Sequence, residues 1–205
     1  MRYLIRRLDE GLRAMQGVYE FSADSQCMLR LSLEVAPHSV PLPDGQMEKG
    51  ELYLELHLWN EHIPRIPVAG PDFAWAHGVH RMLKGSLKAI AAELRTDPRL
   101  ADVKAVGGPN TLILPGNPGG GEGLMRRLGF TVTPYRHPLG RFAELWKNFY
   151  SWLLMRTFNP ASMRGGNLLG LRRSEIWMSR VEFLRRYGAA IPVRISGHAS
   201  NNRIG

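Results

Sequence analysis

The sequence contains one cysteine, Cys27, among its 205 residues, so it can form neither an intramolecular disulfide nor a zinc module built from cysteines. It also lacks any uninterrupted apolar run of the ~18 residues that a membrane-spanning helix needs. Charged residues interrupt the first fifteen positions before an apolar core of signal-peptide length develops. These absences favour a cytoplasmic protein that is soluble or peripheral at the inner face of the membrane.

Acidic residues are scarce in the C-terminal part of the chain. Residues 123–205 hold 14 Lys and Arg but only 3 Asp and Glu, a net charge of +11, whereas residues 1–122 carry a net charge of −2. Thirteen of those 14 cations are arginine, whose planar guanidinium suits phosphate and carboxylate groups. We expect an anionic partner, such as an envelope lipid or a polysaccharide precursor; the alternative is a solvated basic face that only keeps the protein soluble. No pattern typical of nucleic-acid-binding modules occurs, so nucleic acid is not an expected partner.

Apolar periodicity predicts strands interspersed with helices. Residues 29–35 and 51–59 alternate apolar and polar side chains as strands do, and the loop between them has a turn signal at Asp44-Gly45. Asp72 is expected to cap a long amphipathic helix that reaches about residue 96. The other expected elements are helices at 2–15, 123–130, 141–158 and 174–187, the last capped by Ser174, and strands at 103–114, broken at its glycines, and at 130–135. This order predicts an α/β (α+β) fold, with helices packed on a mixed central sheet.

We expect one domain over residues 1–160 and a basic C-terminal extension over residues 161–205, with one helix and a flexible tail. The helix at 141–158 places bulky aromatic residues next to arginine and lysine. That combination is typical of a peripheral contact with an anionic bilayer or of a partner's groove, although core packing is the commoner use of such residues.

A group of polar residues lies at the end of the second strand. His57 shares one side of the strand with Glu55, and Asn60 and Glu61 follow at its exit, where functional residues tend to gather. If the protein is an enzyme, His57 is the candidate base, with Asn60 and Glu61 positioning the substrate. The alternative is that His57 only pairs with Glu55 on the sheet surface. Four histidines lie close in the sequence without a recognised zinc-ligand spacing, so no metal is expected: His57, His62, His77 and His80.

The order of elements resembles that of GNAT-type N-acyltransferases over residues 28–136, with Leu128-Gly129-Phe130 at the turn before the last strand. The resemblance implies acyl-CoA, with its pyrophosphate at the long helix. The nearest match to the cofactor motif is Arg81-Met82-Leu83-Lys84-Gly85-Ser86, which makes Arg81, Lys84, Gly85 and Ser86 the expected cofactor-binding residues. The match departs from the family, because Lys84 and Ser86 stand where it has small residues and because the window lies inside the predicted helix. We expect His57 and Arg81 to line one cleft.

A second resemblance rests on Glu55-Leu56-His57-Leu58-Trp59-Asn60, followed by Gly108, Thr111 and the Leu128-Gly129-Phe130 turn. Over about residues 28–160 the chain is similar to the YkoP-like family, small bacterial domains found alone or attached to polysaccharide deacetylases and near glycosyltransferases. This resemblance implies a cell-envelope polysaccharide or lipid setting. Two functions remain open: an acyltransferase-like domain that acts on or accompanies such a molecule, and a non-catalytic accessory module that binds an anionic polymer, a membrane surface or a partner enzyme.

Overall fold

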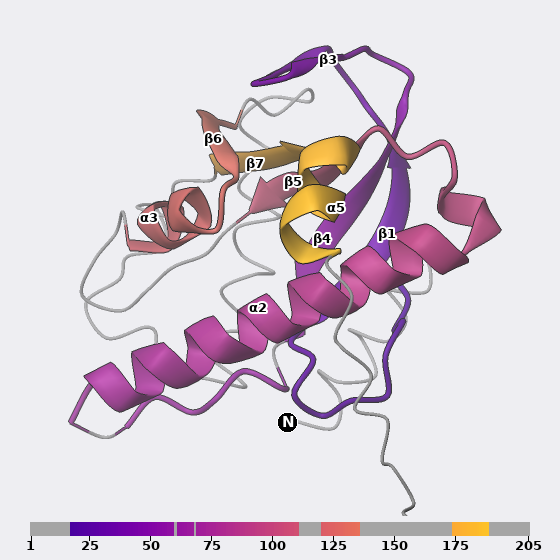
Figure 1. The fold of residues 1–205 in the computed structure, drawn as a ribbon. Coiled ribbons are helices and arrows are strands. Elements are labelled where there is room, and N and C mark those ends of the chain that lie inside the picture. The colour runs from indigo at the N-terminus through magenta and orange to yellow at the C-terminus, as the bar shows by residue number, and fades with distance from the viewer. Residues whose placement is uncertain (1–16, 60, 68, 111–119, 136–173, 189–205) are drawn as a thin grey trace, which may run out of the picture.

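The fold is a mixed five-stranded sheet with helices on one face (Figure 1). The computed structural model describes residues 17–59, 61–67, 69–110, 120–135 and 174–188. Asn60, the helices expected at 2–15 and 141–158, and the tail after residue 188 lie outside the described residues. The predicted α/β class is confirmed, with strands and helices in one mixed architecture.

The strand order in the sheet differs from the order in the chain. Across the sheet the strands are β1 (Leu29–Val35), β4 (Leu52–Leu58), β5 (Ala105–Asn110), β7 (Ser174–Ser179) and β6 (Thr131–Pro134). β1 pairs antiparallel with β4, and these are the two segments whose alternation predicts strands. β4 and β5 are parallel, and the connection that parallel neighbours require is made through helix α2 (Phe73–Thr96).

Helix α2 begins where the sequence predicts. Asp72 is its N-cap, with the carboxylate accepting a hydrogen bond from the backbone N–H of Trp75 at 2.7 Å. The helix buries one side, and the residues on that side are Val79, Met82, Leu83, Ser86, Leu87, Ile90, Ala91 and Leu94. At the other end, the guanidinium of Arg180 donates to the backbone carbonyl of Leu94 at 2.8 Å and also to that of Leu100. Arg180 therefore joins the end of α2 to the start of the last helix.

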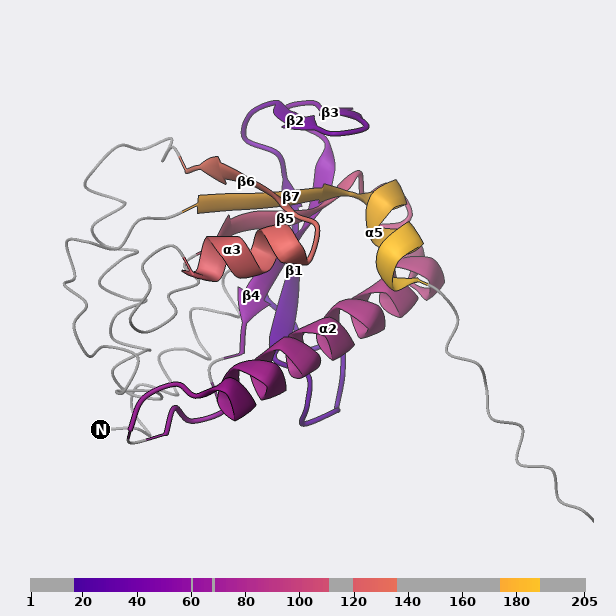
Figure 2. The same cartoon turned by 60° about the vertical axis from the view of Figure 1, so that its left-hand side comes forward.

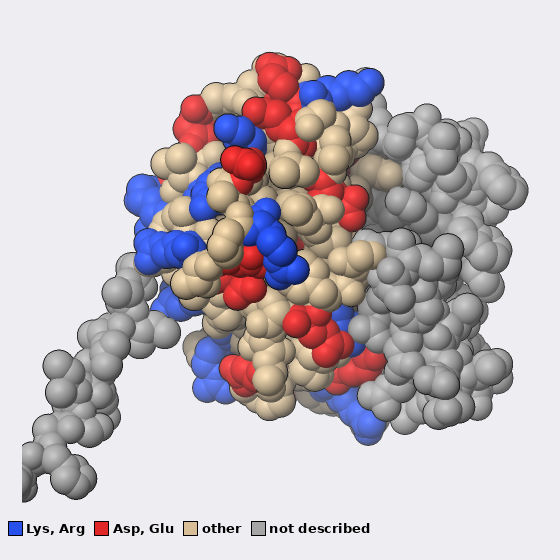
Figure 3. Space-filling view, turned by 90° about the vertical axis from the view of Figure 1, so that its right-hand side faces the viewer, with Lys and Arg blue, Asp and Glu red and all other residues tan. Residues whose placement is uncertain are grey.

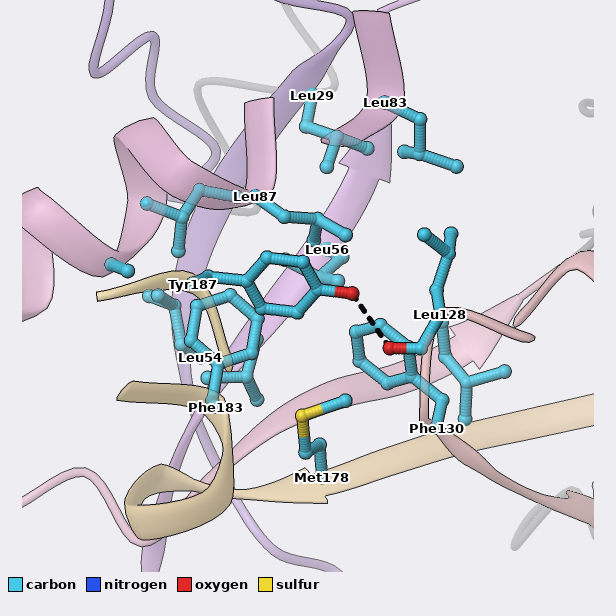
Figure 4. Close-up of a cluster of buried hydrophobic side chains, with 14 of the residues drawn as sticks. Leu29, Leu54, Leu56, Leu83, Leu87, Leu128, Phe130, Met178, Phe183 and Tyr187 are labelled. Carbon is cyan, nitrogen blue, oxygen red and sulfur yellow. Dashed lines mark hydrogen bonds between the residues drawn. The ribbon is translucent and has the colours of Figure 1, made fainter. Parts of the chain in front are cut away.

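The main core lies between α2 and the sheet. Leu54 and Leu56 of β4 face α2, as do Leu29 and Leu31 of β1, because alternate side chains of a strand point to the same face. The short helices α3 (Gly120–Arg127) and α5 (Arg180–Tyr187) pack on the same face (Figure 2). The close-up in Figure 4 shows that this core also contains a polar contact, in which the Tyr187 hydroxyl donates to the backbone carbonyl of Leu128 at 2.6 Å.

A small hairpin covers part of the opposite face. Its strands β2 (Val40–Leu42) and β3 (Gly45–Met47) pair across the predicted Asp44-Gly45 turn, in a segment expected to be only a loop. Together with Tyr53, Ala105 and Trp177, the hairpin forms a second apolar cluster. The 3-10 helix η1 (Pro98–Leu100) follows α2.

The expectation that Ser174 caps a helix was wrong. Residues 174–179 form strand β7, whose six side chains are all buried, and the helix cap is Ser179, which accepts from the N–H of Glu182 at 3.1 Å. Both faces of β7 are covered by the rest of the fold. Its Ser and Glu residues are therefore buried in the sheet and do not mark the exposed start of a helix. β7 lies between β5 and β6, so part of the expected C-terminal extension belongs to the sheet. The strand expected to break at Gly107-Gly108 instead runs through both glycines as β5.

We predict that Tyr187→Phe lowers the free energy of unfolding by about 1–2 kcal/mol, because the carbonyl of Leu128 loses its buried donor. Burial raises the pKa of Tyr187 to about 12, above the ~10 of an unfolded tyrosine. A raised pKa favours the neutral phenol in the folded state, so this contribution is complete below pH ~10 and is lost as the pH rises through ~12. Urea unfolding between pH 8 and 11.5 should show the wild type losing its advantage over the variant above pH ~10. A difference in unfolding free energy between wild type and variant that stays constant across this pH range would contradict the role assigned to the Tyr187 hydroxyl.

Candidate functional site

Strands β4 and β5 separate partway along their length. They pair at only three positions, the last of which joins Glu55 to Gly107. β5 continues from there paired to β7 as far as Asn110, whereas in the described part of the chain positions 56–58 of β4 pair only with β1. His57 thus lies two residues beyond the last pairing between β4 and β5 that the described residues show.

Two glycines in β5 allow its neighbours on β7 and β4 to approach it closely. A Cβ atom on Gly107 would come within 1.8 Å of the carbonyl oxygen of Ile176, so β7 could not approach a larger residue as closely. Gly108 has a φ of +117°, and a Cβ there would meet the Glu55 side chain at 2.8 Å. Glu55 therefore lies across a part of β5 that has no side chains.

The His57 ring contacts both Ser32 and Glu55 through one nitrogen. Its Nε2 atom lies 2.9 Å from the Ser32 hydroxyl oxygen and 4.0 Å from a carboxylate oxygen of Glu55. In a nucleophilic triad the carboxylate orients the other ring nitrogen, so this arrangement does not activate Ser32. Ser32 is also only 1% exposed, too buried to attack a substrate in this conformation. The expected pairing of His57 with Glu55 is present as a long contact.

Glu55 is fixed from its other side by Tyr53, whose hydroxyl donates to the carboxylate at 3.1 Å. Burial raises the pKa of Tyr53 well above that of a free tyrosine, and the negative charge of Glu55 raises it further. Tyr53 therefore stays protonated and remains a hydrogen-bond donor at physiological pH.

Glu61 lies on the same side of the sheet, but as a partner of Arg30. The buried guanidinium of Arg30 binds Glu20 at 3.0 Å, lies 3.6 Å from the Glu61 carboxylate and is 4.3 Å from the centre of the Trp59 ring. Trp59 in turn stacks on His62 with their ring centres 3.7 Å apart. A buried arginine that gathers carboxylates and a ring stabilises the exit of β4, and the role of Glu61 in positioning a substrate stays a prediction.

The polar side of the sheet continues onto β7, where sequence reasoning missed a residue. Glu175 is 4% exposed and accepts a hydrogen bond from the Trp177 indole at 3.0 Å, and His38 lies 3.3 Å from the same carboxylate. Residues 174–179 do not alternate polar and apolar side chains, and the signal they offer for a buried strand is the short apolar run Ile176-Trp177-Met178 that follows Glu175.

The four expected cofactor residues lie elsewhere, in the middle of α2. Arg81, Lys84 and Gly85 are exposed to solvent, whereas Ser86 is buried and donates to the carbonyl of Met82 at 2.9 Å. Only the first four N–H groups of a helix are unpaired, so this window offers a ligand side chains but no free backbone amides.

A surface hollow of about 370 Å³ lies beside this window. Arg81, Gly85 and Ser86 contribute to its wall together with Asp24 and Gln26 of the preceding loop. The side chain of His57 points away from α2, since it bonds Ser32 on the opposite face of the sheet. The structure therefore does not bring His57 and Arg81 into one cleft.

The described residues contain no group of three His, Cys, Asp or Glu side chains that could hold a metal ion. None of the helices in the described residues combines the length and the apolar character that a membrane crossing requires.

A family model described as the YkoP domain matches residues 23–187, most of the chain and all the strands of the sheet. The protein belongs to the YkoP domain family. Comparisons with curated proteins and with solved structures gave no match. The family assignment agrees with the position of β7, because the matched region extends through this strand to the end of α5.

We predict that Gly108→Ala destabilises the domain by about 1–3 kcal/mol, since alanine at a positive φ is strained and its Cβ would collide with Glu55. Gly78→Ala is the matched control. Nothing lies within 4 Å of a Cβ at this helical position, so the change should stabilise the protein by about 0.5–1 kcal/mol. Urea unfolding of the two variants measures both effects, and equal stabilities would show that Gly108 is not required.

Proposed function

We propose that this YkoP domain is a non-catalytic accessory module, built on an acyltransferase-like scaffold, that binds an anionic component of the cell envelope. The observation that carries the proposal is the location of the Arg81–Ser86 window. Its two cations are exposed in the middle of a helix, where they can attract an anion but where no backbone amides are free to cradle a pyrophosphate. The family resemblance to domains associated with polysaccharide deacetylases supports an envelope setting.

The residues near α2 do not fit coenzyme A well. The N-terminus of the helix, which would favour an anion, is capped by the carboxylate of Asp72. Ser86 already accepts the N–H of Met28 at 3.0 Å while it donates to Met82. A pyrophosphate at α2 would thus meet the negative charge of Asp72 at the helix N-terminus. It would also meet a Ser86 hydroxyl that already forms hydrogen bonds within the fold.

The order of helices and strands along the chain supports the proposed acyltransferase-like scaffold. β4, α2 and β5 are followed by α3, the Leu128-Gly129-Phe130 turn and β6, as in the resemblance to N-acyltransferases. In this turn Leu128 and Phe130 are buried, and Gly129 has a φ of +94°. The turn therefore needs glycine between two core residues, which explains this three-residue pattern.

A second candidate function, acyl transfer, is favoured by the position of His57 near the end of β4, with its ring next to Ser32 and Glu55. His57 lies two residues beyond the last paired position and would accept the proton of an attacking hydroxyl or amine. In that case His57→Ala would lower the rate about 10²–10⁴-fold, while the exposed control Lys49→Ala, on the hairpin side of the sheet, would leave it unchanged.

We predict that CoA and acetyl-CoA at ~1 mM leave the melting temperature unchanged, whereas dextran sulfate raises it at low ionic strength. A ligand with a Kd of ~10 μM would stabilise the protein by about 2.7 kcal/mol at this concentration, a shift that is easily measured. Uncharged dextran is the control, and added salt should abolish the effect of dextran sulfate, because exposed charges are screened. Stabilisation by acetyl-CoA together with acyl transfer to an envelope sugar or lipid would replace the accessory role with the catalytic one.

A further inference from the structure

We infer that the solvent-facing side of α2 is the surface with which this domain docks on an anionic lipid bilayer. The inference rests on the proposed binding role and adds the surface and the class of partner. It requires no acyl transfer.

Four cations form a row along α2: Arg81, Lys84, Lys88 and Arg95. With 3.6 residues per turn, these positions lie within about 60° of one another around the helix axis, on the side opposite the buried stripe. All four are exposed, and the row extends over about 20 Å. Among the described residues, the four side chains thus lie on one exposed side of the helix.

Carboxylates do not neutralise this row, here called the α2 cationic row. Within the described residues its four cations form no ion pair. Glu93 lies on α2 about 120° around the axis from Arg81, and Asp24 is the carboxylate that shares the hollow beside Arg81. The face shown in Figure 3 differs, because Lys, Arg, Asp and Glu are mixed there. Unneutralised cations on one side of a helix attract an anionic surface more strongly than mixed charges do.

An exposed aromatic residue marks one end of the row. Phe73, the first residue of α2, is 87% exposed, and its ring stacks on that of His77 with the ring centres 6.3 Å apart. The helical positions of both residues place them on the same side as the cations. An aromatic side chain beside a row of cations suits the headgroup boundary of a bilayer, where the ring enters the apolar edge and the cations meet anionic headgroups. A purely anionic polymer would leave Phe73 without a role, so the bilayer explains more of the surface.

The test uses the full chain, including residues 141–158, and measures flotation with phosphatidylcholine vesicles that contain about one-third phosphatidylglycerol. Each cation near an anionic surface contributes about fivefold to binding, so the triple variant R81Q/K84Q/K88Q should bind about a hundredfold more weakly. The variant K49Q/K104Q/R127Q removes the same charge from exposed positions outside α2 and should change binding less than about threefold. Circular dichroism and the melting temperature check that both variants fold.

A second pair of variants tests the aromatic residue. Phe73→Ser should weaken vesicle binding about tenfold, because the ring no longer enters the bilayer. Val181→Ser is the control, since Val181 is also a largely exposed apolar residue, 73% exposed on α5, away from the row. Equal effects of these two substitutions would overturn the role of Phe73 and with it the assignment of a bilayer.

Three further results would overturn the inference. Unchanged vesicle binding by the triple variant would place the contact elsewhere, and equal losses by both triple variants would mean that only net charge matters. A wild-type protein that shifts an oligonucleotide or binds dextran sulfate, but not vesicles, would exclude the bilayer and leave the accessory binding role intact. Conversely, acyl transfer from acetyl-CoA would overturn the accessory role without changing the flotation result.

Discussion

The packing of α2 on one face of the sheet determines where every polar residue of interest lies. Because leucines at alternate positions of β1 and β4 face this helix, the intervening residues must face away from it. Arg30, Ser32 and His57 are consequently on the far face, and the cations of α2 are on its outer side. The structure thus separates two polar regions that are close in sequence, one organised by hydrogen bonds within the fold and one exposed to solvent.

On the face of the sheet away from α2, the polar side chains form a network of hydrogen bonds and ion pairs within the fold. Arg30 holds Glu20 and Glu61, Tyr53 fixes Glu55, and the Trp177 indole satisfies Glu175. Buried charges are costly unless they are paired in this way, so the network stabilises one arrangement of the sheet. The α2 cationic row differs because its charges are left to solvent or to a partner. This contrast supports the proposal that α2, rather than the far face, is the binding surface.

Local patterns in the sequence predicted the elements well, and the errors arose where tertiary contacts decide the outcome. Asp72 and the alternation at 52–58 carry their own signals, a cap and a period of two, and both predictions were confirmed. Ser174 resembled a helix cap because the sequence does not show that β5 and β6 enclose this segment. His57 and Arg81 were expected in one cleft between the sheet and its long covering helix, whereas the alternation along β4 and the position of Arg81 around α2 direct them apart. Glu175 was missed for the same reason as β7.

The place of β7 has a consequence for how the protein is made. This strand forms hydrogen bonds with both β5 and β6, yet it is among the last described segments of the chain to be synthesised. Until it emerges from the ribosome, two strand edges that are internal in the finished sheet have no neighbour between them. Such edges recruit other chains, so a nascent or truncated product that ends before residue 174 is exposed to aggregation, and completion of the sheet depends on contacts distant in sequence. Synthesis through residue 179 is thus a precondition for a closed sheet.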